Sequence, residues 1–401
     1  MTASRPVDVG PFLPAARGLR RELHRAAEPA HAEHRTRDLV EAALAGVPGL
    51  SVIRVPGTTA VLACTPGSGG ARVLLRSELD ALPMVERTDV PWAATGSATH
   101  ACGHDVHTAA LVALLAAHAA AGPTAAPGLV AVFQHSEEAD PSGAAQVLES
   151  GVLSGLDVRA CLGVHVHPGV PWGEVAVGAG AVNAGADEID IVVHGREGHA
   201  AYPHLAADPV AALCEAVHLA QHALVRRTDP LAPVLLSITQ LAAGDAANVI
   251  PGTARARGTL RAHRPVDRAA ALDLLEEVVR AAAAPFGCTA AVTAGTGDPP
   301  LINDSGLAAA LAARLPSAGL SVGTAWRSFG ADDFARYAPL GPVLMAFVGL
   351  AGHPDFRSRP LHHPEFLPPE DAVDAVARAW AAALAAAIDV ALGGPVPAGP
   401  G

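Results

Sequence analysis

Residues 99–108 read THACGHDVHT, so one thiol and three imidazoles lie within ten residues. Thiolates and imidazoles bind zinc and other borderline-soft metal ions. A cysteine beside a histidine can also be a nucleophile with its base, and a free cysteine is often only a buried core residue. The stretch alone leaves all three interpretations open, and the rest of the chain must distinguish them.

Cys102 and His104 are separated by a single residue. In an extended segment, residues two positions apart point to the same side. The sulfur and the imidazole would then face one ligand together. This spacing favours a metal such as zinc over an isolated buried thiol.

Other candidate ligands lie at or after the ends of four apolar, strand-like runs at 71–77, 128–134, 158–166 and 342–350. In an open parallel α/β sheet, ligands bind outside the carboxyl ends of the strands. Crowding carboxylates and imidazoles at one edge is costly unless something compensates their charge. The convergence therefore favours a metal site. The residues concerned are Glu78, Asp80, Glu137, Glu138, His165, His167, His353, His362 and His363.

Glu137 and Glu138 are adjacent and would point apart in an extended segment. One carboxylate could then bind metal while the other holds a water molecule. Water bound to a metal ion loses a proton more readily, and a neighbouring carboxylate can accept that proton. Two adjacent glutamates thus predict metal-assisted hydrolysis.

The overall composition excludes several classes of protein. The chain has 401 residues, a formal net charge of −12 and a pI near 5.8, which argue against nucleic acid or an anionic membrane as partner. Its apolar helical stretches at 109–121 and 380–388 are too short to cross a bilayer, and residues 1–23 lack a signal-peptide core. Five scattered cysteines form no disulfide framework. We expect a soluble, cytoplasmic protein with no membrane or nucleic-acid partner.

Apolar strands alternate with helices along most of the chain, which predicts an α/β fold with a mostly parallel sheet covered by helices. From about residue 183 the pattern becomes β-α-β-β-α-β, the order of a ferredoxin-like α+β unit. We therefore predict a catalytic domain whose first part is 1–182 and whose second part is 296–401. The α+β domain at 183–295 is inserted between them.

Several motifs occur in order across nearly the whole chain: RSELDALPMVE, HACGHDVHTAAL, GVHVHP, GREGHAAYPH, GADDFARY and LHHPEF. In these motifs the chain closely resembles the dinuclear-metal amidohydrolases and metallopeptidases related to hippurate hydrolase. N-acyl-amino-acid hydrolases, indole-acetyl-amino-acid hydrolases and N-acetyl-diaminopimelate deacetylase are in the same group. The resemblance implies a zinc-peptidase-like catalytic domain and a lid or dimerisation role for 183–295.

The resemblance also implies two divalent metal ions per subunit. Zinc is favoured by the thiolate, with manganese, cobalt or nickel as alternatives. The family spacing favours His362 over His363 as a ligand, and Cys102 is expected to bridge the two ions. The implied ligands are Cys102, His104, Glu138, His165 and His362.

Further roles follow from the same resemblance. Glu137 matches the general acid/base. Asp80 matches a carboxylate that does not bind the metal itself but holds one of the metal ligands in position. His199 matches a histidine that reaches a neighbouring subunit's site and steadies the oxyanion. Asn248 and Arg261 match residues that hold the substrate's carboxylate. A homodimer or a higher homo-oligomer is therefore expected.

The sequence departs from the family pattern at a few positions. Glu78 stands where aspartate is usual, His135 and Ser136 replace Pro-Ala, and Asp332 replaces a glutamate. None of these changes removes a ligand or the base. His107, in the first turn of a helix, is expected to cap or pack rather than to bind metal.

The predicted activity is hydrolysis of the amide bond of an N-acylated amino acid or a similar small conjugate. Two alternatives stay open. One is a metallo-dipeptidase or carboxypeptidase acting on free peptides, and the other is an inactive metal-binding homologue.

Overall fold

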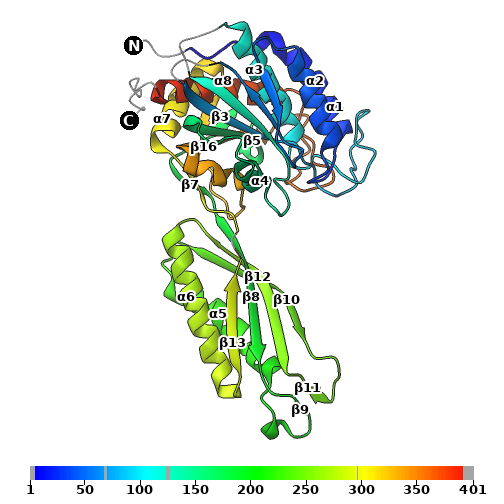
Figure 1. Cartoon of the computed structure of the whole chain (residues 1–401), viewed down its shortest axis with the longest axis vertical. Helices are drawn as coiled ribbons and strands as arrows, with labels where there is room; N and C mark the ends of the chain where they lie inside the picture. The colour runs from blue at the N-terminus through cyan, green and yellow to red at the C-terminus, as the bar shows by residue number, and fades with distance from the viewer. Residues whose placement is uncertain (1–4, 67–69, 123–126, 296, 392–401) are drawn as a thin grey trace. The chain divides into compact units, whose positions relative to one another are not determined.

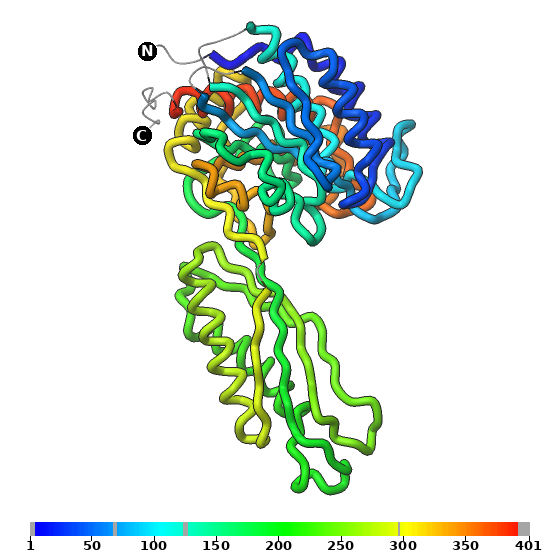
Figure 2. Tube along the Cα trace, viewed as in Figure 1, coloured from blue at the N-terminus to red at the C-terminus, as the bar shows by residue number. Residues whose placement is uncertain are grey.

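The computed structural model describes residues 5–66, 70–122, 127–295 and 297–391 (Figure 1). The chain forms two compact units. The large unit comprises Met1–Gly180, Ile302–Trp326 and Asp333–Gly401, and the small unit comprises Ala181–Leu301 and Arg327–Asp332. In the tube trace the small unit is mainly green to yellow, whereas the large unit contains the blue and red ends of the chain (Figure 2). The small unit is therefore an insertion in the sequence of the large one.

The large unit is built on an eight-stranded sheet with the order β1-β2-β4-β3-β5-β16-β6-β15. Its four central strands, β4, β3, β5 and β16, pair in parallel, and antiparallel neighbours flank them. The predicted α/β fold with a mostly parallel core is confirmed. The strands are β1 (Ser51–Arg54), β2 (Val61–Cys64), β4 (Gly128–Gln134), β3 (Ala71–Glu78), β5 (Asp157–Pro171), β16 (Val343–Ala351), β6 (Glu174–Ala176) and β15 (Ser321–Gly323).

The central strands are apolar because they are covered by helices. Every residue of β4 is buried, as expected of a parallel strand with both faces covered. Helix α3 is apolar on nearly all sides and packs against α1, α8, β3 and β5, so it is a core helix. Helix α4 and the 3-10 helix η6 form a separate pair that contacts β4 and β5. The helices are α1 (Leu13–Arg25), α2 (His34–Ala45), α3 (His104–Ala120), α4 (Gly143–Glu149), α7 (Ser305–Arg314), α8 (Ala372–Ala391) and η6 (Asp333–Leu340).

The small unit has an antiparallel sheet with the order β10-β12-β8-β13, on which α5 and α6 pack through an apolar cluster. The chain order β-α-β-β-α-β with this strand order is that of a ferredoxin-like unit. Residues 327–332, far along the chain from 183–295, belong to this unit as well. Its elements are β8 (Gly185–His194), α5 (Pro209–Arg227), β10 (Val234–Ala243), β12 (Thr253–Ala262), α6 (Pro265–Ala283) and β13 (Thr289–Ala294).

Short elements complete the description. They are η1 (Gly10–Phe12), β7 (Gly180–Asn183), β9 (Gly198–His199), η3 (Pro203–Leu205), β11 (Val249–Ile250), η4 (Ala284–Phe286), β14 (Leu301–Asn303) and η5 (Leu315–Ala318). Within the described ranges, every helix is too short or too polar to cross a lipid bilayer.

Candidate metal centre

The turn before α3 depends on a glycine. Gly103 has a φ of +90°, a conformation that side-chain-bearing residues rarely adopt. A Cβ atom at this position would lie 2.5 Å from Cγ2 of Val166 in β5. Glycine therefore lets the turn press against β5, which brings both Cys102 and His104 next to that strand.

His104 presents one ring nitrogen to the centre. Its Nδ1 lies 2.9 Å from the backbone oxygen of Asp80 and donates its proton there. In the neutral ring, this leaves Nε2 as the nitrogen with the lone pair. Nε2 is buried, and it has no hydrogen-bond partner among the described residues. A buried lone pair held in this way suits a metal ion.

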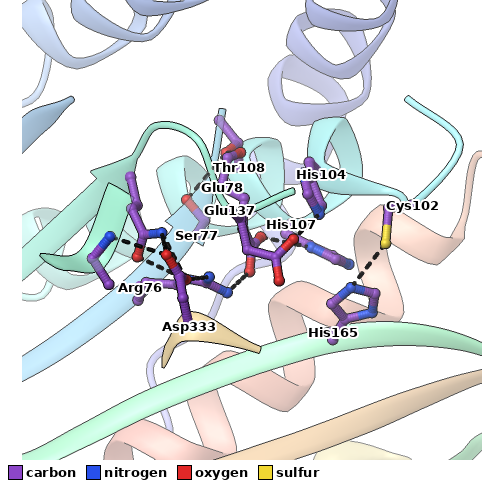
Figure 3. Close-up of polar contacts among 12 residues, drawn as sticks. Arg76, Ser77, Glu78, Cys102, His104, His107, Thr108, Glu137, His165 and Asp333 are labelled. Atoms are coloured by element: carbon purple, nitrogen blue, oxygen red, sulfur yellow. Dashed lines mark hydrogen bonds and ion pairs between the residues drawn. The ribbon is translucent and has the colours of Figure 1, made fainter. Parts of the chain in front are cut away.

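His165 is oriented by the same principle from β5. Its Nδ1 lies 2.6 Å from the backbone oxygen of Val166, and its Nε2 lies 3.5 Å from Sγ of Cys102. Figure 3 shows the sulfur of Cys102 pointing at this ring. Both imidazoles therefore direct Nε2 towards the centre, while backbone carbonyls hold their Nδ1 protons.

His107 has no nitrogen left for a metal ion. Its Nε2 accepts the backbone N–H of Val166 at 2.9 Å, so Nδ1 carries the proton and donates to Oε2 of Glu78 at 2.9 Å. The expected packing role thus agrees with its surroundings. His107 also orients the Val166 peptide, whose carbonyl in turn holds His165.

Glu78, which accepts the proton of His107, belongs to a buried polar network. Arg76 makes ion pairs with Glu78 and with Asp333, the latter at 2.7 Å (Figure 3). Burial alone would raise the pKa of Glu78, but Arg76 and His107 hold it well below its ordinary value. Glu78 is therefore a carboxylate that contacts Arg76 and holds His107.

Glu138 and His362 form a second group of candidate ligands with Cys102. Nε2 of His362 lies 3.0 Å from Oε1 of Glu138, whose backbone N–H donates to Oδ2 of Asp80 at 2.9 Å. His362 has a φ of +62°, and its backbone N–H bonds to the carbonyl of Ala101 at 2.9 Å. Its side chain is 50% exposed, which places it at the solvent side of the centre.

The predicted ligands form overlapping groups whose ligand atoms lie within 4.8 Å of one another. Cys102 belongs to two of these groups, one with the two imidazoles and one with Glu138 and His362. A further group joins the imidazole of the α3 turn to both glutamates. The groups are Cys102, His104 and His165; Cys102, Glu138 and His362; and His104, Glu137 and Glu138.

The chemistry of these donors fits a divalent metal. A thiol, imidazoles and a carboxylate are the ligand types that zinc binds. Burial raises the pKa of the Cys102 thiol well above its ordinary value, and the nearby Glu138 and Glu137 raise it further. An ion would supply the positive charge that stabilises the thiolate.

One expectation about the glutamates is wrong. Glu137 and Glu138 do not point apart, because Oε2 of Glu137 and Oε1 of Glu138 lie 3.9 and 4.0 Å from Nε2 of His104. The reason is the backbone of the preceding residue. Ser136 has a φ of +49°, so the segment bends after β4 instead of continuing as an extended strand.

The support of this bend was not found from the sequence. The buried carboxylate of Glu33 accepts the backbone N–H of Ser136 at 2.8 Å and the hydroxyl of Thr59 at 2.6 Å. His31 Nε2 lies 2.9 Å from Oγ of Ser136. A glutamate in a loop between two helices, among other polar and charged residues, gave no sequence signal for this role.

The three predicted residues of the small unit do not gather at one place. His199 lies in β9, which pairs with β11, and the carbonyl of Asn248 accepts the N–H of Ala200 at 3.0 Å. Arg261 lies near the far end of β12, where its Nη1 donates to the carbonyl of Phe329 at 3.1 Å. It lies eight positions along the strand from Thr253, roughly 26 Å at the usual rise per residue.

Comparison with known proteins identifies the family. The sequence profile of peptidase family M20/M25/M40 matches residues 74–386. The chain belongs to this family. The match covers the α3 turn, the Glu137-Glu138 bend and His362.

Individual relatives span nearly the whole chain. An N-acetyl-L-cysteine deacetylase of Bacillus subtilis (strain 168) is 31% identical over 372 residues, covering 92% of this chain and 87% of the relative. Thermostable carboxypeptidase 1 of Saccharolobus solfataricus is 30% identical over 358 residues, which cover 88% of this chain and 90% of the relative. A Bacillus subtilis crystal structure described as a dinuclear metal binding peptidase from the M20 family is 29% identical, with a TM-score of 0.82 and coverage of 94% and 99%. The predicted family is confirmed.

Metal binding should displace protons from the ligands. Burial lowers the pKa of His104, but Asp80, Glu78 and Glu138 outweigh it and raise that pKa to about 10, so the metal-free ring is protonated at neutral pH. The Cys102 thiol is protonated as well, because its pKa is also raised. Zinc affinity should therefore rise between pH 6 and 8, by up to about tenfold per pH unit for each proton displaced.

Calorimetric zinc titrations of the metal-free protein in buffers of different ionisation enthalpy measure this proton release. Binding heats that do not depend on the buffer would contradict it.

The Glu33 carboxylate should matter for turnover through the position of Glu137. Glu33→Ala leaves the N–H of Ser136 without its acceptor, and we expect kcat to fall about tenfold, a barrier increase of about 1.4 kcal/mol, with KM and metal content little changed. Glu33→Gln keeps an oxygen acceptor and should recover most of the activity. Glu22→Ala, which removes an exposed carboxylate of α1, is the control. An unchanged kcat in folded Glu33→Ala would show that the bend does not need this support.

Proposed function

We propose that this chain removes the acyl group from N-acylated amino acids or similar small amide conjugates, with metal-activated water as the attacking group. Its class as a metal-dependent hydrolase of amide bonds is shown by the family and by the deacetylase relative. The observation that carries the proposal is the gathering of metal-ligand side chains around Cys102 with a second carboxylate, Glu137, beside them.

Two divalent ions per chain are part of this proposal. The two ligand groups that share Cys102 support it, as does the related structure described as dinuclear. Cys102, His104, Glu138, His165 and His362 would hold the ions. When bound, they would polarise the scissile carbonyl and make water more acidic. Zinc is favoured because thiolate is a soft ligand.

Glu137 is the proposed acid/base. Its side chain is 12% exposed, so it can reach a water molecule while most of it is shielded from solvent. Its carboxylate would take a proton from the attacking water and deliver that proton to the departing amine nitrogen. Asp80 accepts the N–H of Glu138 and lies behind His104, so it would keep both ligands in place.

His199, Asn248 and Arg261 are proposed to bind the substrate and the developing oxyanion. Asn248 and Arg261 lie far apart along the small unit of one chain, so they cannot hold the same carboxylate from within that unit. This separation supports a dimer in which His199 and Asn248 of one chain serve the metal centre of the other. A guanidinium and an amide suit the carboxylate of an amino acid product.

Glu137→Gln tests the central role. The variant keeps shape and a possible hydrogen bond but cannot accept a proton, so kcat should fall by about 10²- to 10⁴-fold while metal content stays unchanged. Turnover should be measured on N-acetyl, N-benzoyl and free dipeptide substrates with metal-replete protein. Preference for free dipeptides would favour a carboxypeptidase, as in the Saccharolobus relative, over the proposed deacylase. No hydrolysis of any of them would support an inactive homologue.

Mixing two inactive variants tests whether His199 of one subunit acts at the metal centre of the other subunit. Chains with Glu137→Gln and chains with His199→Ala should each be nearly inactive as homodimers. A hybrid dimer has one centre with intact Glu137 that receives intact His199 from the other chain. Unfolding and refolding an equal mixture should therefore restore about a quarter of wild-type activity, the statistical share for random pairing of two chains. Refolding without any recovery would place His199 in the same chain's site or outside it.

A further inference from the structure

A cavity lies in the large unit, and its lining contains none of the residues of the metal centre. It has a volume of about 700 Å³ and is formed by the segment before η1, the end of α7 with η5, and the middle of α8. Cavities that bind small molecules commonly span about 300–1,000 Å³. None of the residues that line it is a predicted metal ligand or substrate-binding residue.

Positive charge gathers in this cavity although the chain as a whole is acidic. Arg5, Arg314 and Arg378 line it, and Asp8 is the one carboxylate in its lining. Oδ1 of Asp8 already accepts the N–H of Gly10 at 3.0 Å. Three arginines from three separate segments therefore line a space whose own lining holds one carboxylate, and one of them, Arg314, is paired with Asp389 outside that lining.

Two of the guanidinium groups have hydrogen-bonding capacity left over. Nε of Arg314 and Nε of Arg378 are buried, and neither has an acceptor in the part of the chain that the structure describes. Arg314 is ion-paired with Asp389 through Nη2, and its Nη1 reaches the carbonyl of Ala310 at 3.3 Å. Because these Nε atoms are shielded from solvent, an anion in the cavity would be bound by the Nη groups of Arg378, which has no ion pair among the described residues.

The remaining walls of the cavity are apolar. Val7, Val9, Ala313, Ala318 and Ala381 contribute them. Such walls favour a ligand that carries hydrocarbon beside its charge, because burying that hydrocarbon adds to binding. A hydrated inorganic ion would gain nothing from them.

We propose that this cavity binds a small organic carboxylate with an apolar body. A planar guanidinium matches a carboxylate through two parallel hydrogen bonds, and Arg378 would supply both from its Nη groups. The site is separate from the metal centre and does not depend on the activity proposed above.

Calorimetric titration of the metal-loaded enzyme with benzoate tests the site, with benzamide as the neutral analogue and inorganic phosphate as the anion without hydrocarbon. Benzoate should bind saturably and more tightly than either. Arg378→Met keeps an apolar side chain of similar length and should weaken benzoate binding at least tenfold. Arg226→Met, on exposed α5, removes a guanidinium elsewhere and should change nothing.

Chelation of the metals separates this site from the catalytic one, because a carboxylate can also bind there. Benzoate binding that persists after chelation and is weakened in Arg378→Met belongs to the cavity. If Arg378→Met does not fold by circular dichroism, Arg5→Met, at an exposed position, replaces it. Equal affinity in wild type and variants, loss of all binding on chelation, or tighter binding of benzamide or phosphate would each overturn the proposal.

Discussion

The thiol of Cys102 lies where two sets of ligand-type side chains meet, and the chemistry proposed for the large unit depends on that meeting. Cys102 contacts His165 from β5, and its second group brings in Glu138 and His362 from two other loops. Buried sulfur, imidazole and carboxylate atoms within a few ångströms of one another are costly without a compensating charge. A bound cation is the simplest physical reason for a protein to assemble them.

The residues around the centre occupy the other ring nitrogens of its histidines, so that only certain nitrogen atoms can bind a metal ion. Backbone carbonyls occupy Nδ1 of His104 and of His165, so each ring can offer only Nε2. His107 is held by Glu78 and by a backbone N–H, so it cannot compete for a metal ion. Orientation by such outer partners is what gives a metal ligand its correct tautomer and direction. The small unit, by contrast, contributes residues that are proposed to act on the substrate.

The sequence predicted the fold class and the convergence of ligand-type residues at one sheet edge from local patterns, whereas the choice of the five ligands followed from the family resemblance. Apolar runs mark the parallel strands, and parallel strands deliver their following residues to one edge, which is why His165 and Glu138 could be grouped with Cys102. The bend at Ser136 could not be predicted, because a positive φ at a non-glycine residue leaves no sequence signature. Glu33 was missed for a related reason, since its partner lies about a hundred residues away along the chain. Residues 327–332 join the small unit through long-range contacts that no periodicity encodes.

The most direct test of the account is an anomalous-scattering map of the crystallised enzyme, recorded at the absorption edge of whichever metal elemental analysis finds. The account predicts two peaks per chain, both within about 2.5 Å of the Cys102 sulfur and each also contacted by an imidazole. A well-ordered chain in which that sulfur has no metal neighbour, under metal-replete conditions, would contradict it.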